Sequence, residues 1–353
     1  MTSTRTIGET EVLETHTAEL FQEAVRRAAK LLCQNEVVAL PTETVYGLAG
    51  NAWSREAVSQ IFQIKGRSPE NPLIVHVASF EMARACVAVW PESAAALARA
   101  FWPGALTLVL PKSASIPDEV TAGGNTVAIR WPSHPFIQAV ISTCGFPLAA
   151  PSANLSNELS PTTARHVQKS LGSLIPLIVD GGQCQIGIES TVVDLCSEPP
   201  RILRPGLITA GAIGAVAGDT GSGGETTGSA LLRSPGMLSK HYAPKARLVI
   251  AKWDNSRELQ QWIAAEHPWA GMVCVISHQL IPSAEHFARV SVIPHDPEAY
   301  ARALYAELHE CDESGADLIV VEAPPDVEAW AGVKDRLRRA SGGACWPLCV
   351  ENP

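Results

Sequence analysis

The stretch from Val37 to Val77 constrains the fold more than any other part of this chain. It contains two short apolar segments, Val37 to Leu40 and Leu73 to Val77, separated by a polar turn, a predicted helix from Ser54 to Ile64 and a basic turn. Short apolar segments bounded by turn residues are typical of buried strands. We therefore expect two strands that bring hydroxyl groups, two cations and one histidine to the same edge of a sheet.

The basic turn follows the predicted helix directly. Ser54 is a suitable N-cap and Gly66 stands where helices commonly end in left-handed backbone, so Lys65 and Arg67 flank the helix C-terminus. Two interpretations are open: the cations complement the negative end of the helix dipole, or they bind a polyphosphate. In the next strand His76 interrupts an apolar run, a position where a hydrogen-bonded core histidine is more common than a ligand.

Two later segments also place polar groups in the predicted sheet. Thr126 and Arg130 share one face of a strand because side chains alternate with a period of two. A buried arginine requires an anionic partner, which is either a protein carboxylate or a substrate carboxylate held by two guanidinium nitrogens. Ser160 is the expected cap of a helix that begins with Pro161. That helix start is either an ordinary cap or an anion site formed by free amides.

The chain length of 353 residues exceeds what one hydrophobic core usually serves, so we expect more than one domain. The predicted divisions are a lead-in over residues 1–16, a catalytic domain over 17–210, a flexible linker over 211–246 and a C-terminal domain over 247–345. The linker is predicted from the stretch GAIGAVAGDTGSGGETTG, which is rich in glycine, serine and threonine and lacks the lysine of a Walker A loop.

A regular pattern begins after Arg247. Apolar segments at 248–251, 272–276, 288–293 and 318–322 alternate with helical patterns at 256–265, 297–311 and 327–340. Such alternation is typical of a three-layer α/β unit. The fold class is therefore predicted as α/β: a mixed twisted sheet with flanking helices, followed by a smaller Rossmann-like α/β domain.

Charge and cysteine content exclude several classes of protein. The net charge of −9 lacks the basic surplus typical of nucleic-acid-binding proteins. No apolar run approaches the ~18 residues of a membrane span, and the polar N-terminus has no signal-peptide core, so we expect a cytoplasmic protein. The nine cysteines form no CxxC pair, which indicates free thiols and no metal site.

Eight motifs occur in one order over residues 41 to 244: PTETVYGL, KGRSPENPLIVHV, FWPGALTLVL, TVAIRWPSHP, APSANLSNELSPTT, IESTVVDL, ILRPG and SPGMLSKHYAP. Together they closely resemble the threonylcarbamoyl-AMP synthase family in its two-domain form, whose catalytic domain has the YrdC-like fold. The resemblance implies a nucleotidyltransferase. Such an enzyme forms threonylcarbamoyl-AMP and pyrophosphate from L-threonine, bicarbonate and ATP, for the modification of adenosine 37 in certain tRNAs.

The resemblance also implies roles for individual residues, position by position. The catalytic cations would be Lys65 and Arg67, which stabilise charge on phosphate oxygens. L-threonine would be bound by Thr44, His76, Arg130, Ala150 and Ser190. ATP would be bound by Arg67, Asn71, Thr126, Ser152, Asn154, Ser160, Arg204 and Tyr242. The segment 234–244, which contains Tyr242, is expected to form a lid over the active site.

ATP is expected as a substrate that carries Mg²⁺, with no tightly bound cofactor and no protein metal cage. The unstable product is expected to pass to a threonylcarbamoyl transferase complex, and direct tRNA binding is left open. Two alternatives stay in view. One is an RNA-binding YrdC-like module without catalysis, against which the acidic balance counts. The other is a carbamoyl-adenylate-forming enzyme of hydrogenase maturation, whose zinc-finger and acylphosphatase-like regions do not occur in this sequence.

Overall fold

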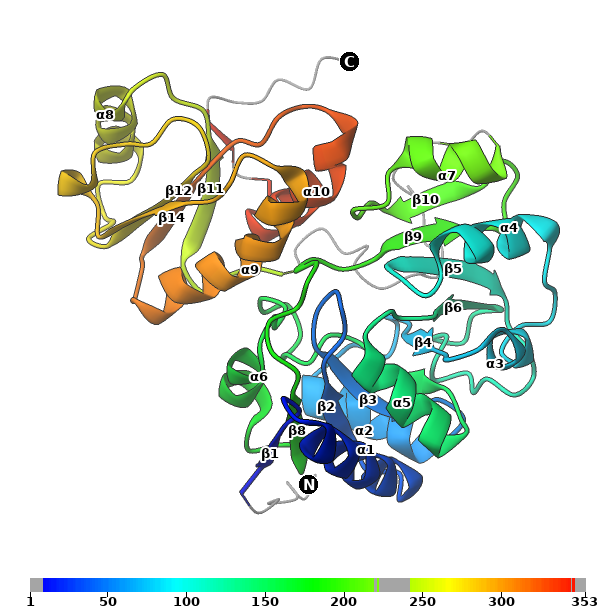
Figure 1. Ribbon diagram of the computed structural model, residues 1–353. Coiled ribbons are helices and arrows are strands. Elements are labelled where there is room, and N and C mark those ends of the chain that lie inside the picture. Colours follow the sequence, from blue (N-terminus) through cyan, green and yellow to red (C-terminus); the bar gives the residue numbers. More distant parts are fainter. Residues whose placement is uncertain (1–8, 219–220, 222–241, 344, 347–353) are drawn as a thin grey trace. The chain divides into compact units, whose positions relative to one another are not determined.

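The computed structural model describes residues 9–218, 221, 242–343 and 345–346. These residues form two compact units (Figure 1). The first contains the described residues 9–156 and 160–221, and the second contains 157–159 and those from 242 onward. Within the described ranges, no helix is both long enough and apolar enough to cross a membrane.

The first unit is built on one mixed sheet of ten strands. Its strands are β1 (Glu11–Glu14), β2 (Val38–Leu40), β3 (Gly47–Asn51), β4 (Ile74–His76), β5 (Leu106–Pro111), β6 (Thr126–Arg130), β7 (Leu148–Ala149), β8 (Leu177–Asp180), β9 (Thr191–Asp194) and β10 (Arg201–Arg204). Their spatial order is β1-β8-β2-β3-β7-β4-β6-β5-β9-β10. The sheet contains both parallel pairs (β1 with β8, β2 with β8, β4 with β6, β5 with β9) and antiparallel pairs.

The helices of the first unit are α1 (Ala18–Cys33), α2 (Arg55–Lys65), α3 (Phe80–Ala85), α4 (Glu92–Phe101), α5 (Pro135–Cys144), α6 (Ala164–Leu171) and α7 (Ala210–Ala217). The predicted capping of α2 is confirmed: the Ser54 side chain accepts from the Ala57 amide, and Gly66 ends the helix with φ 59°. This local chemistry fixes the point at which the basic turn leaves the helix.

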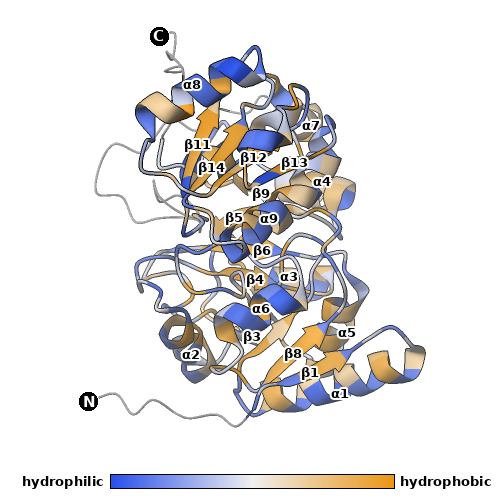
Figure 2. Ribbon diagram, turned by 90° about the vertical axis from the view of Figure 1, so that its left-hand side faces the viewer, coloured by the Kyte–Doolittle hydropathy of each residue, from blue (hydrophilic) through white to orange (hydrophobic). Residues whose placement is uncertain are grey.

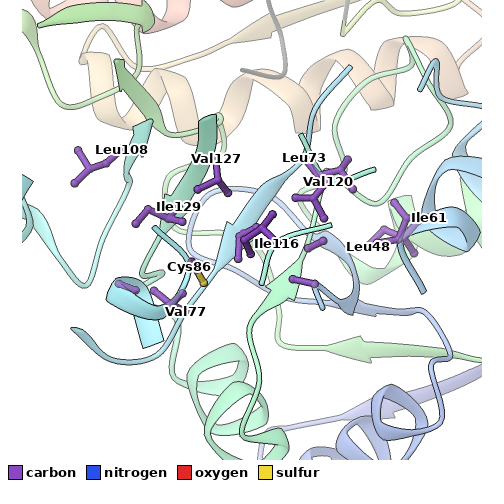
Figure 3. Packing of buried hydrophobic residues seen from close by; sticks show 14 of the residues in the cluster. Leu48, Ile61, Leu73, Val77, Cys86, Leu108, Ile116, Val120, Val127 and Ile129 are labelled. Carbon is purple, nitrogen blue, oxygen red and sulfur yellow. The ribbon is translucent and has the colours of Figure 1, made fainter. Parts of the chain in front are cut away.

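The largest core of the first unit joins the sheet to α2, α4 and α6. Leu48 of β3 lies beside Ile61 of α2 (Figure 3). A side chain at Gly50 would meet the Ile61 Cδ1 atom at 3.2 Å, so β3 needs small residues for α2 to pack on it. Each buried Leu or Ile side chain contributes about 1.5–3 kcal/mol, and this packing holds the turn after α2 in place.

The second unit contains a five-stranded sheet in which every pair is parallel. Its strands are β11 (Arg247–Ala251), β12 (Val273–Ser277), β13 (Arg289–Val292), β14 (Leu318–Glu322) and β15 (Cys345–Trp346), in the order β13-β12-β14-β11-β15. Its helices are α8 (Ser256–Glu266), α9 (Pro297–Glu313) and α10 (Ala331–Ala340), with short 3₁₀ turns at Ala284–His286 and Glu328–Trp330. Apolar residues concentrate on β11, β12 and β14 (Figure 2). The parallel sheet and its helices confirm the predicted α/β class for this unit.

Two predicted irregular segments are regular structure. Residues 11–14, assigned to the lead-in, form the edge strand β1, which pairs with β8 far along the chain. Residues 210–217, where the linker was predicted to begin, form α7. The Thr209 side chain caps this helix, and Ile213 is buried in the core. Capping and burial outweigh the cost of the glycines at 211 and 214.

The prediction that the two strands of the stretch 37–77 bring their polar groups to the same edge of the sheet is also wrong. Strands β3 and β7 lie between β2 and β4, and the three successive pairings are antiparallel, so β2 and β4 run in opposite directions. Their carboxyl ends therefore point to opposite edges. The polar groups meet because the turn after β2 and the long Arg130 side chain reach each other.

Candidate functional site

The centre of the candidate site is the guanidinium group of Arg130, at the end of β6. It is 3% exposed, and its Nη1 donates to the Thr44 hydroxyl at 2.8 Å, while its Nε donates to the Gly104 carbonyl at 3.1 Å. Its Nη2 lies 2.6 Å from the Glu43 Oε1 atom. Of the two partners that the sequence left open for Arg130, the structure contains the protein carboxylate.

Glu43 and Thr44 belong to the turn between β2 and β3. The Thr42 hydroxyl accepts from the Thr44 amide and donates to the Val45 carbonyl, so this turn is held by its own side chain. Glu43 Oε1 also accepts from the Ser133 amide at 3.0 Å. The turn is thus connected both to the arginine and to the segment that follows β6.

His76 ends β4 and is paired in register with Arg130 of β6. Burial, reinforced by the Arg130 charge and opposed by Glu43, lowers the pKa of His76 to about 3, so the ring is neutral at physiological pH. Its Nδ1 atom is buried without a hydrogen-bond partner among the described residues. A buried polar atom in this state costs free energy unless a ligand completes it.

Lys65 and the loop after β7 form a second group. The Lys65 side chain is 2% exposed, and its Nζ donates to the carbonyl groups of Ser152 and Asn154. The Asn154 Oδ1 lies 3.4 Å from the same ammonium group. Residues of two separate sequence motifs, KGRSPENPLIVHV and APSANLSNELSPTT, are therefore in direct contact.

Arg67 leaves the same turn in another direction. Its Nε donates to the Asn71 carbonyl at 3.0 Å and its Nη2 to the Pro72 carbonyl at 2.9 Å. The Asn71 side-chain oxygen is buried without a hydrogen-bond partner among the described residues. The two cations flank Gly66, which has left-handed backbone, as the sequence predicted.

A third group surrounds Ser190, before β9. Its hydroxyl lies 2.7 Å from the Thr107 hydroxyl and accepts from Arg204 Nη2 at 3.1 Å. The Arg204 Nε donates to the Ser190 carbonyl. Next to it, the Ser160 hydroxyl donates to Glu189 at 2.5 Å. Ser160 is therefore not a helix cap, and α6 begins after Thr163, whose side chain accepts from the His166 amide.

Three predicted site residues lie outside these groups. Ala150 is buried after β7, and its amide donates to the Ile74 carbonyl. Thr126 is the half-buried first residue of β6. Tyr242 belongs to the second unit, where its ring is 2% exposed and packs against Tyr305 and the Arg336 guanidinium. Most of the predicted lid, residues 234–241, lies outside the described residues.

The acidic and hydroxyl partners in this site were not predicted from the sequence. Glu43 and Glu189 are buried and hold Arg130 and Ser160, and Thr107 holds Ser190. The signal for the two glutamates was present, because each stands next to a predicted threonine-binding residue in a motif. Among the described residues, no group of three or more His, Cys, Asp or Glu side chains could hold a metal ion.

Two family models match the chain. A model described as "Telomere recombination" matches residues 30–206, and the model of the threonylcarbamoyl-AMP synthase C-terminal domain matches residues 208–342. These ranges correspond closely to the sheet of the first unit and to the chain that follows it.

Known relatives match over nearly the full length. The threonylcarbamoyl-AMP synthase of Pyrococcus abyssi is 40% identical, covering 90% of this chain and 94% of that protein. The protein of the same name from Bacillus subtilis is 42% identical, covering 90% and 93%. Among solved structures, P. abyssi Sua5 complexed with L-threonine matches with a TM-score of 0.88 and 37% identity, covering 95% of this chain and 99% of that one.

Proposed function

This chain belongs to the threonylcarbamoyl-AMP synthase family, and we propose that it forms threonylcarbamoyl-AMP and pyrophosphate from L-threonine, bicarbonate and ATP. The observation that carries the proposal is the buried group of Arg130, Thr44 and His76 in the first unit. It offers a cation, a hydroxyl and a neutral imidazole at one place, which suits the carboxylate and hydroxyl groups of threonine.

The reaction needs charge stabilisation at phosphorus more than a covalent enzyme intermediate. The threonine amine takes up CO₂ derived from bicarbonate, the carbamate oxygen attacks the α-phosphorus of ATP, and pyrophosphate leaves. Lys65 and Arg67 lie at the end of α2 and Arg204 lies at the end of β10. In our proposal these three cations stabilise the negative charge that develops on the phosphate oxygens. Mg²⁺ belongs to the ATP substrate, which brings it to the site.

The remaining assignments are parts of the same proposal. Asn71, Thr126, Ser152, Asn154, Ser160 and Tyr242 contact the nucleotide, and Ala150 and Ser190 complete the threonine site. The lid over residues 234–244 follows α7 in a linker between a catalytic domain and a C-terminal α/β domain. The enzyme works in the cytoplasm and passes its product to a threonylcarbamoyl transferase complex that modifies tRNA.

The test is release of pyrophosphate by the full chain with ATP, Mg²⁺ and bicarbonate. We expect release only when threonine is added, and the nucleotide product should carry the threonylcarbamoyl group by mass spectrometry. Valine lacks the hydroxyl, and a site built to bond a hydroxyl rejects such an analogue by about 10⁴-fold. Release with carbamoyl phosphate in place of threonine and bicarbonate would contradict the proposal.

A further inference from the structure

Glu43 is a buried anion that the proposed reaction does not yet use. Its side chain is 2% exposed, and its Oε1 atom accepts a hydrogen bond from the Ser133 amide and forms an ion pair with Arg130 Nη2, 2.6 Å away. Its Oε2 atom is buried without a hydrogen-bond partner among the described residues. Glu43 thus has one carboxylate oxygen bonded within the protein and one that is available to a ligand.

The Nη2 atom of Arg130 also has no hydrogen-bond partner among the described residues, and it lies beside Glu43. The Nε and Nη1 atoms donate to Gly104 and Thr44, whereas Nη2 lies 2.6 Å from Glu43 Oε1 but makes no hydrogen bond of acceptable direction to any described residue. An open donor and an open acceptor therefore occur on two buried residues in contact. Open groups of opposite kind are complementary to a ligand that carries both a carboxylate and an ammonium group.

The charges of the site lead to the same ligand. Burial acts to raise the pKa of Glu43, but the Arg130 charge and the Ser133 amide outweigh it and hold that pKa below the usual range. Glu43 is thus ionised and balances Arg130. A ligand bearing only a carboxylate would leave one uncompensated negative charge in a buried site, which is costly. A zwitterion adds no net charge.

His76 adds no charge to this cluster. Its ring is neutral at physiological pH because burial, together with Arg130, lowers its pKa to about 3. A neutral imidazole leaves the carboxylate of Glu43 as the anionic group of this cluster, which otherwise contains Thr44 and the cation of Arg130.

We infer that Glu43 binds the α-ammonium group of the amino-acid substrate through Oε2, while Arg130 Nη2 binds the substrate carboxylate. Glu43 thereby restricts the site to amino acids and excludes carboxylic acids that have the same carboxylate and hydroxyl groups but lack the amine. The inference rests on the proposed function, because it identifies how the same site recognises its substrate class. It adds Glu43 as a specificity residue to Thr44, His76, Arg130, Ala150 and Ser190.

The experiment compares threonine with 3-hydroxybutyrate, which has the same carboxylate and hydroxyl groups but no amine. Binding to the full chain is measured by calorimetry, for the wild type, for Glu43→Gln and for the control Glu322→Gln in the second unit. A charged hydrogen bond contributes about 1.5–3 kcal/mol, so Glu43→Gln should weaken threonine binding by about 10- to 150-fold. Its affinity for 3-hydroxybutyrate should stay the same or increase, while Glu322→Gln should bind both ligands as the wild type does.

The ratio of the two affinities shows whether Glu43 contacts the substrate or only positions Arg130. If Glu43 merely positioned Arg130, Glu43→Gln would weaken both ligands equally, because both have a carboxylate, and the inference would be overturned. Comparable affinity of the wild type for the two ligands would also overturn it, even if the variant did not fold. Failure of the wild type to bind threonine at all, by contrast, would contradict the proposed function.

Discussion

Two buried glutamates, one in each unit, differ in how their oxygens are used. Glu322, at the end of β14, accepts hydrogen bonds from the amides of His278, Gln279 and Leu280 through both carboxylate oxygens. Glu43, in the turn after β2, has one oxygen without a hydrogen bond among the described residues. Both are almost fully buried, so burial alone does not distinguish them.

Two buried histidines differ in the same way. The His278 Nε2 lies 3.3 Å from the Ala323 carbonyl, which can only accept, so Nε2 donates. The His278 Nδ1 lies 2.8 Å from His295 Nδ1, and His295 Nε2 lies 3.3 Å from the side-chain nitrogen of Gln279. Each of these ring nitrogens has a partner. The His76 Nδ1 of the first unit has none among the described residues.

The contrast shows which buried polar groups of each unit are still able to bind a ligand. A polar group whose bonds are all made within the protein stabilises one conformation, whereas a buried group with an open bond lowers stability until a ligand completes it. We therefore expect substitutions around Arg130 to change ligand binding and turnover. Substitutions around His278 should change the stability of the second unit.

The largest expected effect compares two lysines. Lys65→Ala in the first unit should reduce the rate of pyrophosphate release by about 10²-fold or more, because in our proposal it removes a cation that stabilises the transition state. The matched control is Lys334→Ala in the second unit, where the lysine pairs with Asp326 on the surface. Steady-state kinetics of both variants check the prediction. Near-normal turnover in a folded Lys65→Ala protein would contradict the prediction that the two lysines differ.

A smaller effect is expected for Glu322→Gln. The substitution removes the charge that holds three successive backbone amides, so the free energy of unfolding of the second unit should fall by about 2 kcal/mol. Hydrogen exchange of the β12 and β14 amides measures this unit separately. Threonine affinity should not change. If hydrogen exchange in β12 stays as slow as in the wild type, the hydrogen bonds of the Glu322 carboxylate do not stabilise the end of β12.

The smallest effect concerns acid stability. The folded pKa of His76 lies far below its unfolded value of 6.5, so the unfolded chain binds the extra proton and stability falls as pH decreases from about 6.5 towards 3. Between pH 6 and 5 this group should lower the free energy of unfolding by about 1 kcal/mol. Urea unfolding of the wild type and of His76→Gln gives the difference.

The control for this measurement is His16→Gln, which changes an exposed side chain before α1. It should leave the pH dependence of the urea midpoint as in the wild type. Equal pH dependence of the wild type and His76→Gln would mean that His76 takes up its proton in the folded state.

Local signals in the sequence predicted much of the fold. The cap residue Ser54 and the terminating Gly66 define α2, because each acts within one helical turn of its own position. The repeated strand and helix pattern after Arg247 predicted the second unit for the same reason. Strand β3 was not predicted, since its sequence GLAGN has low strand propensity and is selected by the close packing of α2.

The site was predictable in its residue types but not in its connections. Motifs identified Thr44 and Arg130, and the structure shows that they share a hydrogen bond. The sequence could not choose the anion beside Arg130, because Glu43 approaches it through a turn whose path depends on the strand order of the whole sheet. Similarly, Ser160 has the sequence context of a cap, yet its hydroxyl bonds to Glu189.

The pairing of β1 with β8 affects how the chain folds during synthesis. Glu11 is in register with Leu177, so 177 − 11 = 166 residues must be made after Glu11 before its partner exists. At about 5–20 residues per second, the ribosome needs roughly 8–33 s for that length. Contacts between such distant residues form late and slow folding. The first strand to be made is therefore among the last to join its sheet, and until then β8 is an open edge available to other strands.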